Sequence, residues 1–172
     1  DAYNVAVGSN AGQLVSTGVE NILIGGNAGD ALTSGAYNIA IGRNALGAED
    51  THGRNVAIGH SALAAQDAGA DAYNTAVGFW AGLAITTGVQ NVILGGLAGD
   101  ALTTGSNNVA IGFGALSAED GHGRNIAVGQ GTLQNQNAGA DAYNVAIGYE
   151  AGNDITTGIT NTLIGGLAGD AL

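Results

Sequence analysis

Two copies of one short stretch carry the side chains that could do acid–base or metal chemistry. AEDTHGRN at 48–55 and AEDGHGRN at 118–125 each bring a Glu, an Asp, a His and an Arg together. As a catalytic group, the carboxylate and imidazole would form an acid–base pair beside an arginine clamp. As a structural group, Arg54 would form an ion pair with Glu49 or Asp50 across one turn, with an equivalent pair in the second copy. A group that recurs at the repeat spacing favours the structural interpretation, so we expect ion pairs here.

The three histidines add little to this chemistry. His52 and His122 could bind a metal or an anion only if a threefold axis gathered three copies of each, and His60 is expected in a solvated turn. We find no Ser-His-Asp spacing and no phosphate-binding loop in the sequence, which also lacks cysteine. We therefore predict no catalytic residue, no cofactor and no metal ligand.

A second stretch resembles a calcium-binding motif. GGLAGDAL at 95–102 and 165–172, and GGNAGDAL at 25–32, come close to the nonapeptide G-G-x-G-x-D-x-U-x of parallel β-rolls, but Ala replaces the fourth-place glycine. A nonapeptide roll binds calcium between successive turns and needs tandem copies at nine-residue spacing. The two full copies lie 70 residues apart, so we interpret the stretch as a tight turn with Asp at its corner.

Both stretches belong to a repeat that covers the whole chain. A pentapeptide with Asn first and Gly fifth recurs at spacings of 17, 17, 17, 19, 17, 17, 17, 19 and 17, and the pattern itself recurs every 70 residues, as DAYN at 1, 71 and 141 shows. The ten starts are Asn4, Asn21, Asn38, Asn55, Asn74, Asn91, Asn108, Asn125, Asn144 and Asn161. Self-similarity at such a period is typical of a solenoid.

Two kinds of coil alternate in pairs along this repeat. One kind has Gly at its ninth place and an apolar residue at its twelfth, as at Gly82 and Ile85. The other has Glu or Gln at its twelfth place and Leu at its ninth, namely Leu46, Leu63, Leu116 and Leu133. Each coil therefore keeps one large apolar residue in its second half, which we expect in the core.

Seventeen residues rich in Gly and β-branched side chains are too few for a pair of helices and fit one coil of a β-solenoid, with two short strands and two turns. Because side chains alternate along a strand, we expect the second and fourth residues, such as Val5 and Val7, to fill the interior. The Asn residues are expected in turns, and stacked coil on coil they could also form a side-chain ladder.

The third residue of each pentapeptide would then face outward. It is Ala in seven coils and Leu or Ile in three, and a face this rich in Ala suits close approach of another backbone. We therefore predict that copies of the chain associate through this place. The predicted interface residues are Ala6, Leu23, Ala40, Ala57, Ala76, Ile93, Ala110, Ala127, Ala146 and Leu163.

Composition excludes several classes of function. The net charge is −11 with only three basic side chains, whereas nucleic-acid binding needs clustered Lys and Arg. The longest apolar runs fall far short of the about 20 residues that span a bilayer, so we expect no membrane insertion. We expect residues 1–172 to form a single repeat domain. Because solenoids need polar caps, its uncapped ends predict either a fragment of a longer fibre or partner chains that cover the ends.

The pentapeptides N-V-A-I-G, N-I-A-V-G and N-T-A-V-G, each followed by a turn of small residues, resemble the repeats of trimeric autotransporter adhesin heads, the YadA-like β-roll. They also resemble repeats of phage tail-fibre proteins. The resemblance implies an all-β, left-handed parallel β-roll with three chains side by side, in an extracellular, cell-surface or virion fibre. The adhesin coils are shorter and carry Ser after the Asn.

The resemblance implies a non-enzymatic adhesive segment that binds a host-surface or matrix ligand. The sixth and seventh places of the coil vary, and we expect a contact surface there, formed by Phe79, Trp80, Phe113 and Tyr149, since exposed aromatic residues often mark contact surfaces. The longer loops 64–73 and 134–143 are further candidates.

The sequence leaves four alternative interpretations of the function or origin of this chain. A phage tail-fibre shaft fits the same repeats. An ice-binding solenoid would use Thr rows such as 86–87 and 103–104, which the second kind of coil interrupts. A polysaccharide-cleaving enzyme on a β-helix would use the acidic and histidine residues of 48–55. A consensus-designed array would explain why the copies are so alike.

Overall fold

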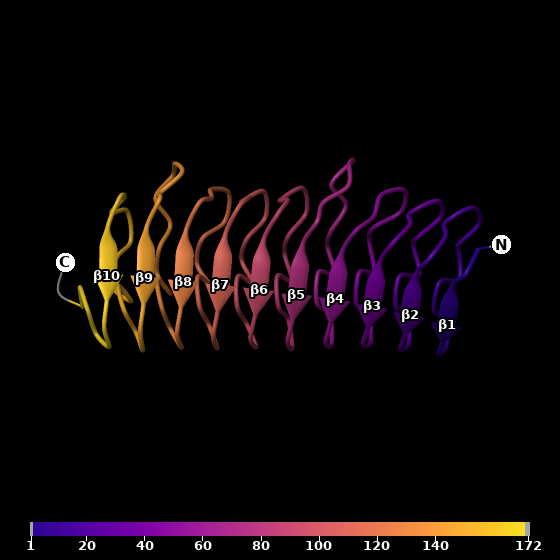
Figure 1. Cartoon of the computed structure of the whole chain (residues 1–172), viewed down its shortest axis with the longest axis horizontal. Helices are drawn as coiled ribbons and strands as arrows, with labels where there is room; N and C mark the ends of the chain where they lie inside the picture. The colour runs from indigo at the N-terminus through magenta and orange to yellow at the C-terminus, as the bar shows by residue number, and fades with distance from the viewer. Residues whose placement is uncertain (1, 171–172) are drawn as a thin grey trace.

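Short parallel strands stack along the length of the molecule and form one continuous sheet (Figure 1). The computed structural model describes residues 2–170, and these residues form ten strands and no helix. The strands are β1 (Val5–Val7), β2 (Ile22–Ile24), β3 (Ile39–Ile41), β4 (Val56–Ile58), β5 (Thr75–Val77), β6 (Val92–Leu94), β7 (Val109–Ile111), β8 (Ile126–Val128), β9 (Val145–Ile147) and β10 (Thr162–Ile164). Each pairs with the next in chain order. The predicted all-β parallel β-solenoid of about ten coils is confirmed.

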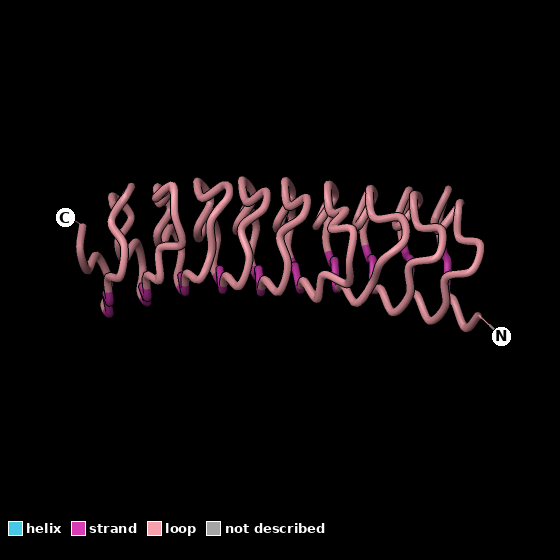
Figure 2. Tube along the Cα trace, turned by 90° about the horizontal axis from the view of Figure 1, so that it is seen from above, coloured by secondary structure: helices cyan, strands magenta, loops and turns pink. Residues whose placement is uncertain are grey.

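The remainder of each coil is turn, although we expected a second strand. Figure 2 shows the strands on one side of the stack and loops around the rest. The backbone turns through positive φ at the fifth and ninth places, as at Gly95 (φ +136°) and Leu116 (φ +54°), where an extended strand cannot continue. Backbone hydrogen bonds still join successive coils there, for example from Gly99 N–H to the Ala115 carbonyl at 2.9 Å.

The strand side chains face the opposite way from our prediction. The third-place residues, assigned above to an interface between chains, are buried inside the solenoid in the eight inner coils, whereas the second and fourth residues are exposed or half-buried. The buried set is Leu23, Ala40, Ala57, Ala76, Ile93, Ala110, Ala127 and Ala146. In the end coils Ala6 is exposed and Leu163 half-buried. The predicted interface through this place is therefore wrong, because side chains that fill one chain's interior cannot contact another chain.

The narrow interior explains why Ala dominates the third place. Where this place holds Leu23 or Ile93, the ninth place of the same coil is glycine. A Cβ on Gly29 would lie 2.8 Å from Leu23 Cδ2, and one on Gly99 would lie 3.1 Å from Ile93 Cδ1. Interiors are close-packed, so a large side chain at the third place leaves no room for a side chain at the ninth place of the same coil.

The predicted core residues of the second half of each coil are confirmed. In the described part of the chain, the buried large apolar residues at the ninth and twelfth places are Leu32, Leu46, Leu63, Ile85, Leu102, Leu116, Leu133 and Ile155. Leu172, also expected in the core, lies outside the described residues. Burial of these side chains supplies the solenoid's main apolar contribution, at about 1.5–3 kcal/mol for each fully buried Leu or Ile.

The predicted asparagine ladder is also confirmed. The backbone N–H of each Asn from Asn21 to Asn161 donates to the side-chain Oδ1 of the Asn one coil earlier, in nine bonds of 2.8–3.2 Å. Most of the side-chain Nδ2 groups donate to a turn carbonyl of the same coil, as Asn91 does to Gly105 at 2.9 Å. The ladder fixes the coil spacing because each rung satisfies buried polar groups.

The two longer coils break this pattern. Their extended loops, at 64–73 and 134–143, rise above the others in Figure 1, and the buried Nδ2 groups of Asn55 and Asn125 have no hydrogen-bond partner. In these loops the turn carbonyl that accepts from the Asn Nδ2 in other coils lies away from the ladder.

The described residues contain no candidate membrane-spanning helix.

Candidate functional site

The outer face of the sheet presents two parallel columns of apolar side chains. These are the second and fourth residues of every coil, and none of the twenty is buried or charged. Eighteen are Val, Ile or Leu, and two are Thr75 and Thr162. We call this surface the strand face. Ile126, in the eighth of the ten coils, is 38% exposed.

The strand face is regular because the strands pair in register. Equivalent residues face each other across neighbouring coils, as Val109 and Ile126 do. At about 4.8 Å per coil, nine steps make the columns about 43 Å long. Soluble monomers rarely expose contiguous apolar patches larger than a few hundred Å², and larger ones mark interaction surfaces. Sequence reasoning missed this face because it placed these side chains in the core.

Exposed aromatic rings follow the rim where each strand ends. Phe79 is 52% exposed, and its ring stacks on Trp80 with centroids 4.8 Å apart and on His60 at 5.4 Å. His60, expected alone in a solvated turn, therefore belongs to this cluster. Phe113 and Tyr149, also predicted contact residues, are exposed farther along the rim. The structure places all four on the surface as expected, with Phe79 and Trp80 in contact.

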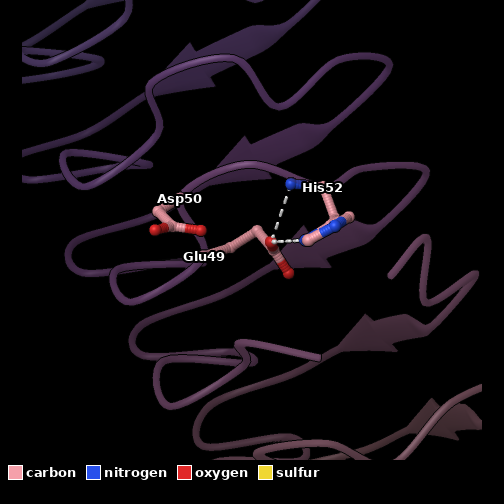
Figure 3. Close-up of side chains that lie close together, drawn as sticks. All are labelled: Glu49, Asp50 and His52. Atoms are coloured by element: carbon pink, nitrogen blue, oxygen red, sulfur yellow. Dashed lines mark hydrogen bonds and ion pairs between the residues drawn. The ribbon is translucent and has the colours of Figure 1, made fainter. Parts of the chain in front are cut away.

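The acid–histidine turns have the same arrangement in both copies, and Figure 3 shows the first of them. Glu49 Oε1 accepts a hydrogen bond from the backbone N–H of His52 at 3.1 Å, and His52 Nδ1 lies 3.8 Å from the same oxygen. In the second copy the corresponding distances between Glu119 and His122 are 3.2 and 3.4 Å. The Glu side chains are 0% exposed and the His side chains 31% exposed. Each turn thus pairs a buried carboxylate with an imidazole that reaches solvent.

Burial sets the electrostatics of these glutamates. Loss of solvent raises the pKa of Glu49 and of Glu119 above the ordinary 4.5, and the hydrogen bond from the histidine backbone opposes that rise. Nearby Asp67 and Asp50 raise the pKa of Glu49 further, while His52 lowers it. The second carboxylate oxygen, Oε2, has no hydrogen-bond partner in either glutamate.

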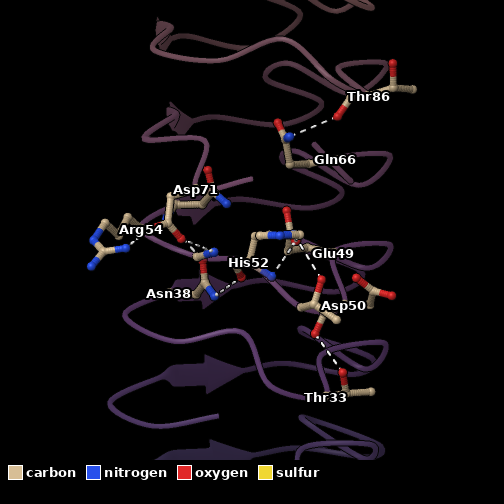
Figure 4. A network of polar contacts seen from close by, with 12 residues as sticks. Thr33, Asn38, Glu49, Asp50, His52, Arg54, Gln66, Asp71 and Thr86 are labelled. Atoms are coloured by element: carbon tan, nitrogen blue, oxygen red, sulfur yellow. Dashed lines mark hydrogen bonds and ion pairs between the residues drawn. The ribbon is translucent and has the colours of Figure 1, made fainter. Parts of the chain in front are cut away.

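The arginines do not pair with these carboxylates as predicted. Arg54 forms its ion pair with Asp71 (Figure 4). The guanidinium also lies over the rings of Tyr37 and Tyr73, 5.2 and 5.6 Å from their centroids. Arg124 pairs with Asp141 in the same way. The prediction is wrong because Glu49 points into the coil while the arginine lies on its surface.

The GGLAGDAL stretch forms a turn over the core. Leu97 and Gly99 have φ near +58° and +53°, and Leu102 is fully buried. Burial raises the pKa of Asp100, although its own backbone N–H and that of Ala101 oppose this. Two clusters of acidic and histidine side chains in residues 2–170 are close enough to share a cation, and Asp100 belongs to neither of them.

Together the fold and its faces define a parallel β-solenoid with one short strand in each coil. Comparison with protein-family models, with curated proteins and with solved structures found no match to this chain.

Proposed function

We propose that this chain is a non-enzymatic segment of a trimeric surface fibre, in which three copies lie side by side and cover one another's strand faces. The observation that carries the proposal is the strand face itself, whose twenty outward residues include no charge and only two hydroxyls. A protein interface of standard size uses about 20–30 residues on each side. The face therefore has the extent and the chemistry of an interface.

The geometry favours another copy of the chain as the partner. A second solenoid has the same coil spacing, so its columns can match the strand face along the full length. Burying uncharged side chains avoids the desolvation cost of charges. The chain has a net charge of −11, and none of its exposed charged residues belongs to the strand face, so like charge disfavours association through the other surfaces. The number three comes from the resemblance of the N-V-A-I-G coils to trimeric adhesin heads.

In such a fibre the aromatic rim supplies the contact with a host-cell or matrix ligand. Phe79 and Trp80 lie on the rim beside the strand face, so association through that face leaves them accessible. Aromatic residues are enriched among the few that dominate binding energy at interfaces. A phage tail-fibre shaft is the alternative setting, and it predicts the same association of copies.

An ice-binding solenoid receives less support. The Thr hydroxyls that would form its rows are used within the fold, since Thr86 Oγ1 donates to the Thr103 carbonyl at 3.2 Å and Thr103 Oγ1 donates to the Asp120 carbonyl at 2.8 Å. The row then ends at Asp120. A thermal-hysteresis measurement on the chain tests this alternative directly.

A pair of variants tests the proposed association. Ile126→Glu places a charge within the strand face, in the eighth of its ten coils, and we expect it to convert the trimer to a folded monomer in sedimentation velocity. Leu97→Glu is the matched control, since Leu97 is also an exposed aliphatic residue but lies on the rim. The control should remain trimeric. A trimer that persists in Ile126→Glu would exclude the strand face as the interface.

A further inference from the structure

The twelfth-place glutamates carry charge into the interior without the partners that usually accompany it. Glu49 and Glu119 are fully buried, and the Oε2 of each has neither solvent contact nor a hydrogen bond. The next coil in each case has Gln at the same place, Gln66 and Gln136, whose Oε1 accepts a bond from a ladder Asn. A buried carboxylate with one oxygen unpartnered is costly, and the recurrence of Glu at this place points to a cationic ligand.

Each buried glutamate belongs to a cluster with two further ligand groups. One carboxylate oxygen of Glu119, one of Asp120 and one ring nitrogen of His122 all lie within 4.8 Å of one another, and Glu49, Asp50 and His52 repeat this arrangement. In Figure 3 the carboxylate of Glu49 lies between the side chains of Asp50 and His52. The buried glutamate, whose Oε2 has no hydrogen-bond partner, is therefore part of the cluster itself.

The protein's own cations do not neutralise these clusters. Arg54 and Arg124 follow the clusters directly in sequence, yet they pair with Asp71 and Asp141 on the surface. Each cluster is left with two carboxylates and one imidazole.

We propose that Glu119, Asp120 and His122 bind a divalent transition-metal ion such as Zn²⁺, and that Glu49, Asp50 and His52 form a second, weaker site. One imidazole nitrogen and two carboxylate oxygens are common ligands of zinc, with water completing a tetrahedral shell. Calcium is disfavoured because it takes six to eight oxygen ligands and does not use imidazole. Ligands bound at about 2.0–2.2 Å to a tetrahedral Zn²⁺ lie about 3.4 Å from one another. Glu119 Oε1 and His122 Nδ1 are already 3.4 Å apart.

One residue distinguishes the two sites. In the first copy the hydroxyl of Thr51 lies 3.0 Å from His52 Nδ1 and can occupy that nitrogen. In the second copy the corresponding residue is Gly121, and His122 Nδ1 is buried without a hydrogen-bond partner. A metal must compete with Thr51 only in the first copy, so the second site binds more tightly.

This proposal does not depend on the proposed fibre function, because every ligand of a site comes from one coil of one chain. A bound ion would tie the buried Glu to the turn that carries the Asp and His. It would therefore stabilise the second kind of coil, whose twelfth place lacks the apolar residue found in the first kind.

Isothermal titration of the full chain with ZnCl₂, after treatment with EDTA, tests the proposal. We expect two sites per chain with different affinities, and a metal-dependent rise in Tm. Glu119→Gln should remove the tighter site and Glu49→Gln the weaker one. Both variants are expected to fold because Gln already occupies this place in the neighbouring coils. Thr51→Gly, which makes the first copy match the second, should bring the affinity of the weaker site close to that of the tighter one.

His60→Asn serves as the control, since it removes a histidine outside both clusters and should leave two sites. Folding of each variant is checked by circular dichroism before titration. The proposal is overturned if Zn²⁺ does not bind, if binding persists in the variant with both glutamates replaced, or if CaCl₂ binds the same clusters as tightly as ZnCl₂.

Discussion

Replacing Asn91 with alanine should lower the free energy of unfolding by more than the loss of a surface hydrogen bond would. Its side-chain Oδ1 accepts the backbone N–H of Asn108 at 2.9 Å, and its Nδ2 donates to the Gly105 carbonyl at 2.9 Å. Both backbone groups belong to buried residues. Leaving a buried polar group unsatisfied costs about 1–3 kcal/mol, so two such groups give a loss of about 2–6 kcal/mol in the free energy of unfolding.

Urea denaturation followed by circular dichroism measures this loss. Wild type and variants must be compared at one protein concentration, because association contributes to apparent stability. Asn135→Ala is the matched control, since Asn135 is exposed and its side chain bonds only Asn153 at 3.3 Å. We expect a change below about 0.5 kcal/mol there, as for most surface substitutions. An Asn91→Ala variant as stable as that control would refute the reasoning that the ladder holds the coils together.

Three further substitutions test the packing and the buried charge. Gly95→Ala should lower the free energy of unfolding by at least about 1–3 kcal/mol, because its φ is +136° and its Cβ would lie 2.6 Å from the Gly112 carbonyl oxygen; a neutral effect in urea denaturation would contradict the close coil spacing. Leu102→Ala should cost about 2–5 kcal/mol by opening a cavity in a fully buried position, and the same assay would show a smaller loss if that part of the core were loosely packed. In EDTA, Glu119→Gln should match wild type below the ordinary glutamate pKa of 4.5, where the carboxyl is protonated in both the folded and the unfolded chain. The variant should become the more stable protein as the pH rises, because burial raises the folded-state pKa of Glu119 and its ionisation then disfavours the fold. Equal stability of the two proteins at neutral pH would show that this burial carries no cost.

Much of the fold followed from the repeat alone. The regular Asn and Gly of each pentapeptide predicted the stacked coils, the ladder and the apolar residues at the ninth and twelfth places. These features depend on local backbone geometry and on a period that recurs in every coil. The number of strands in a coil did not follow, because positive φ at residues such as Leu116 ends the extended backbone where no glycine signals it.

The direction of the strand side chains was predicted wrongly for a reason that the sequence itself contains. The first and third residues of each pentapeptide lie on the same side of the extended backbone. An Asn ladder that faces inward therefore requires a third residue that also faces inward. The prediction placed the larger Val and Ile of the second and fourth places in the interior and so did not meet that requirement. A second signal was the pairing of Leu23 and Ile93 with glycines at the ninth place of the same coils. That pairing shows that the third and ninth places compete for the same interior space.

The acid–histidine turn was recognised from its residue types, but its burial and the partner of its arginine were not. The twelfth place is apolar in the first kind of coil, and that should have placed Glu49 inside as well. Asp71 belongs to the longer loop of the following coil, and only the folded chain brings it beside Arg54. Such a contact between coils depends on how a loop of irregular length folds back.

The mass of the chain in solution, measured by sedimentation equilibrium at micromolar concentration, tests the central claim most directly. If three copies cover one another's strand faces, the particle should have three times the mass of the 16.7 kDa chain. A single species of 16.7 kDa across the concentration range would contradict the proposed fibre, because the strand face would then remain uncovered in water.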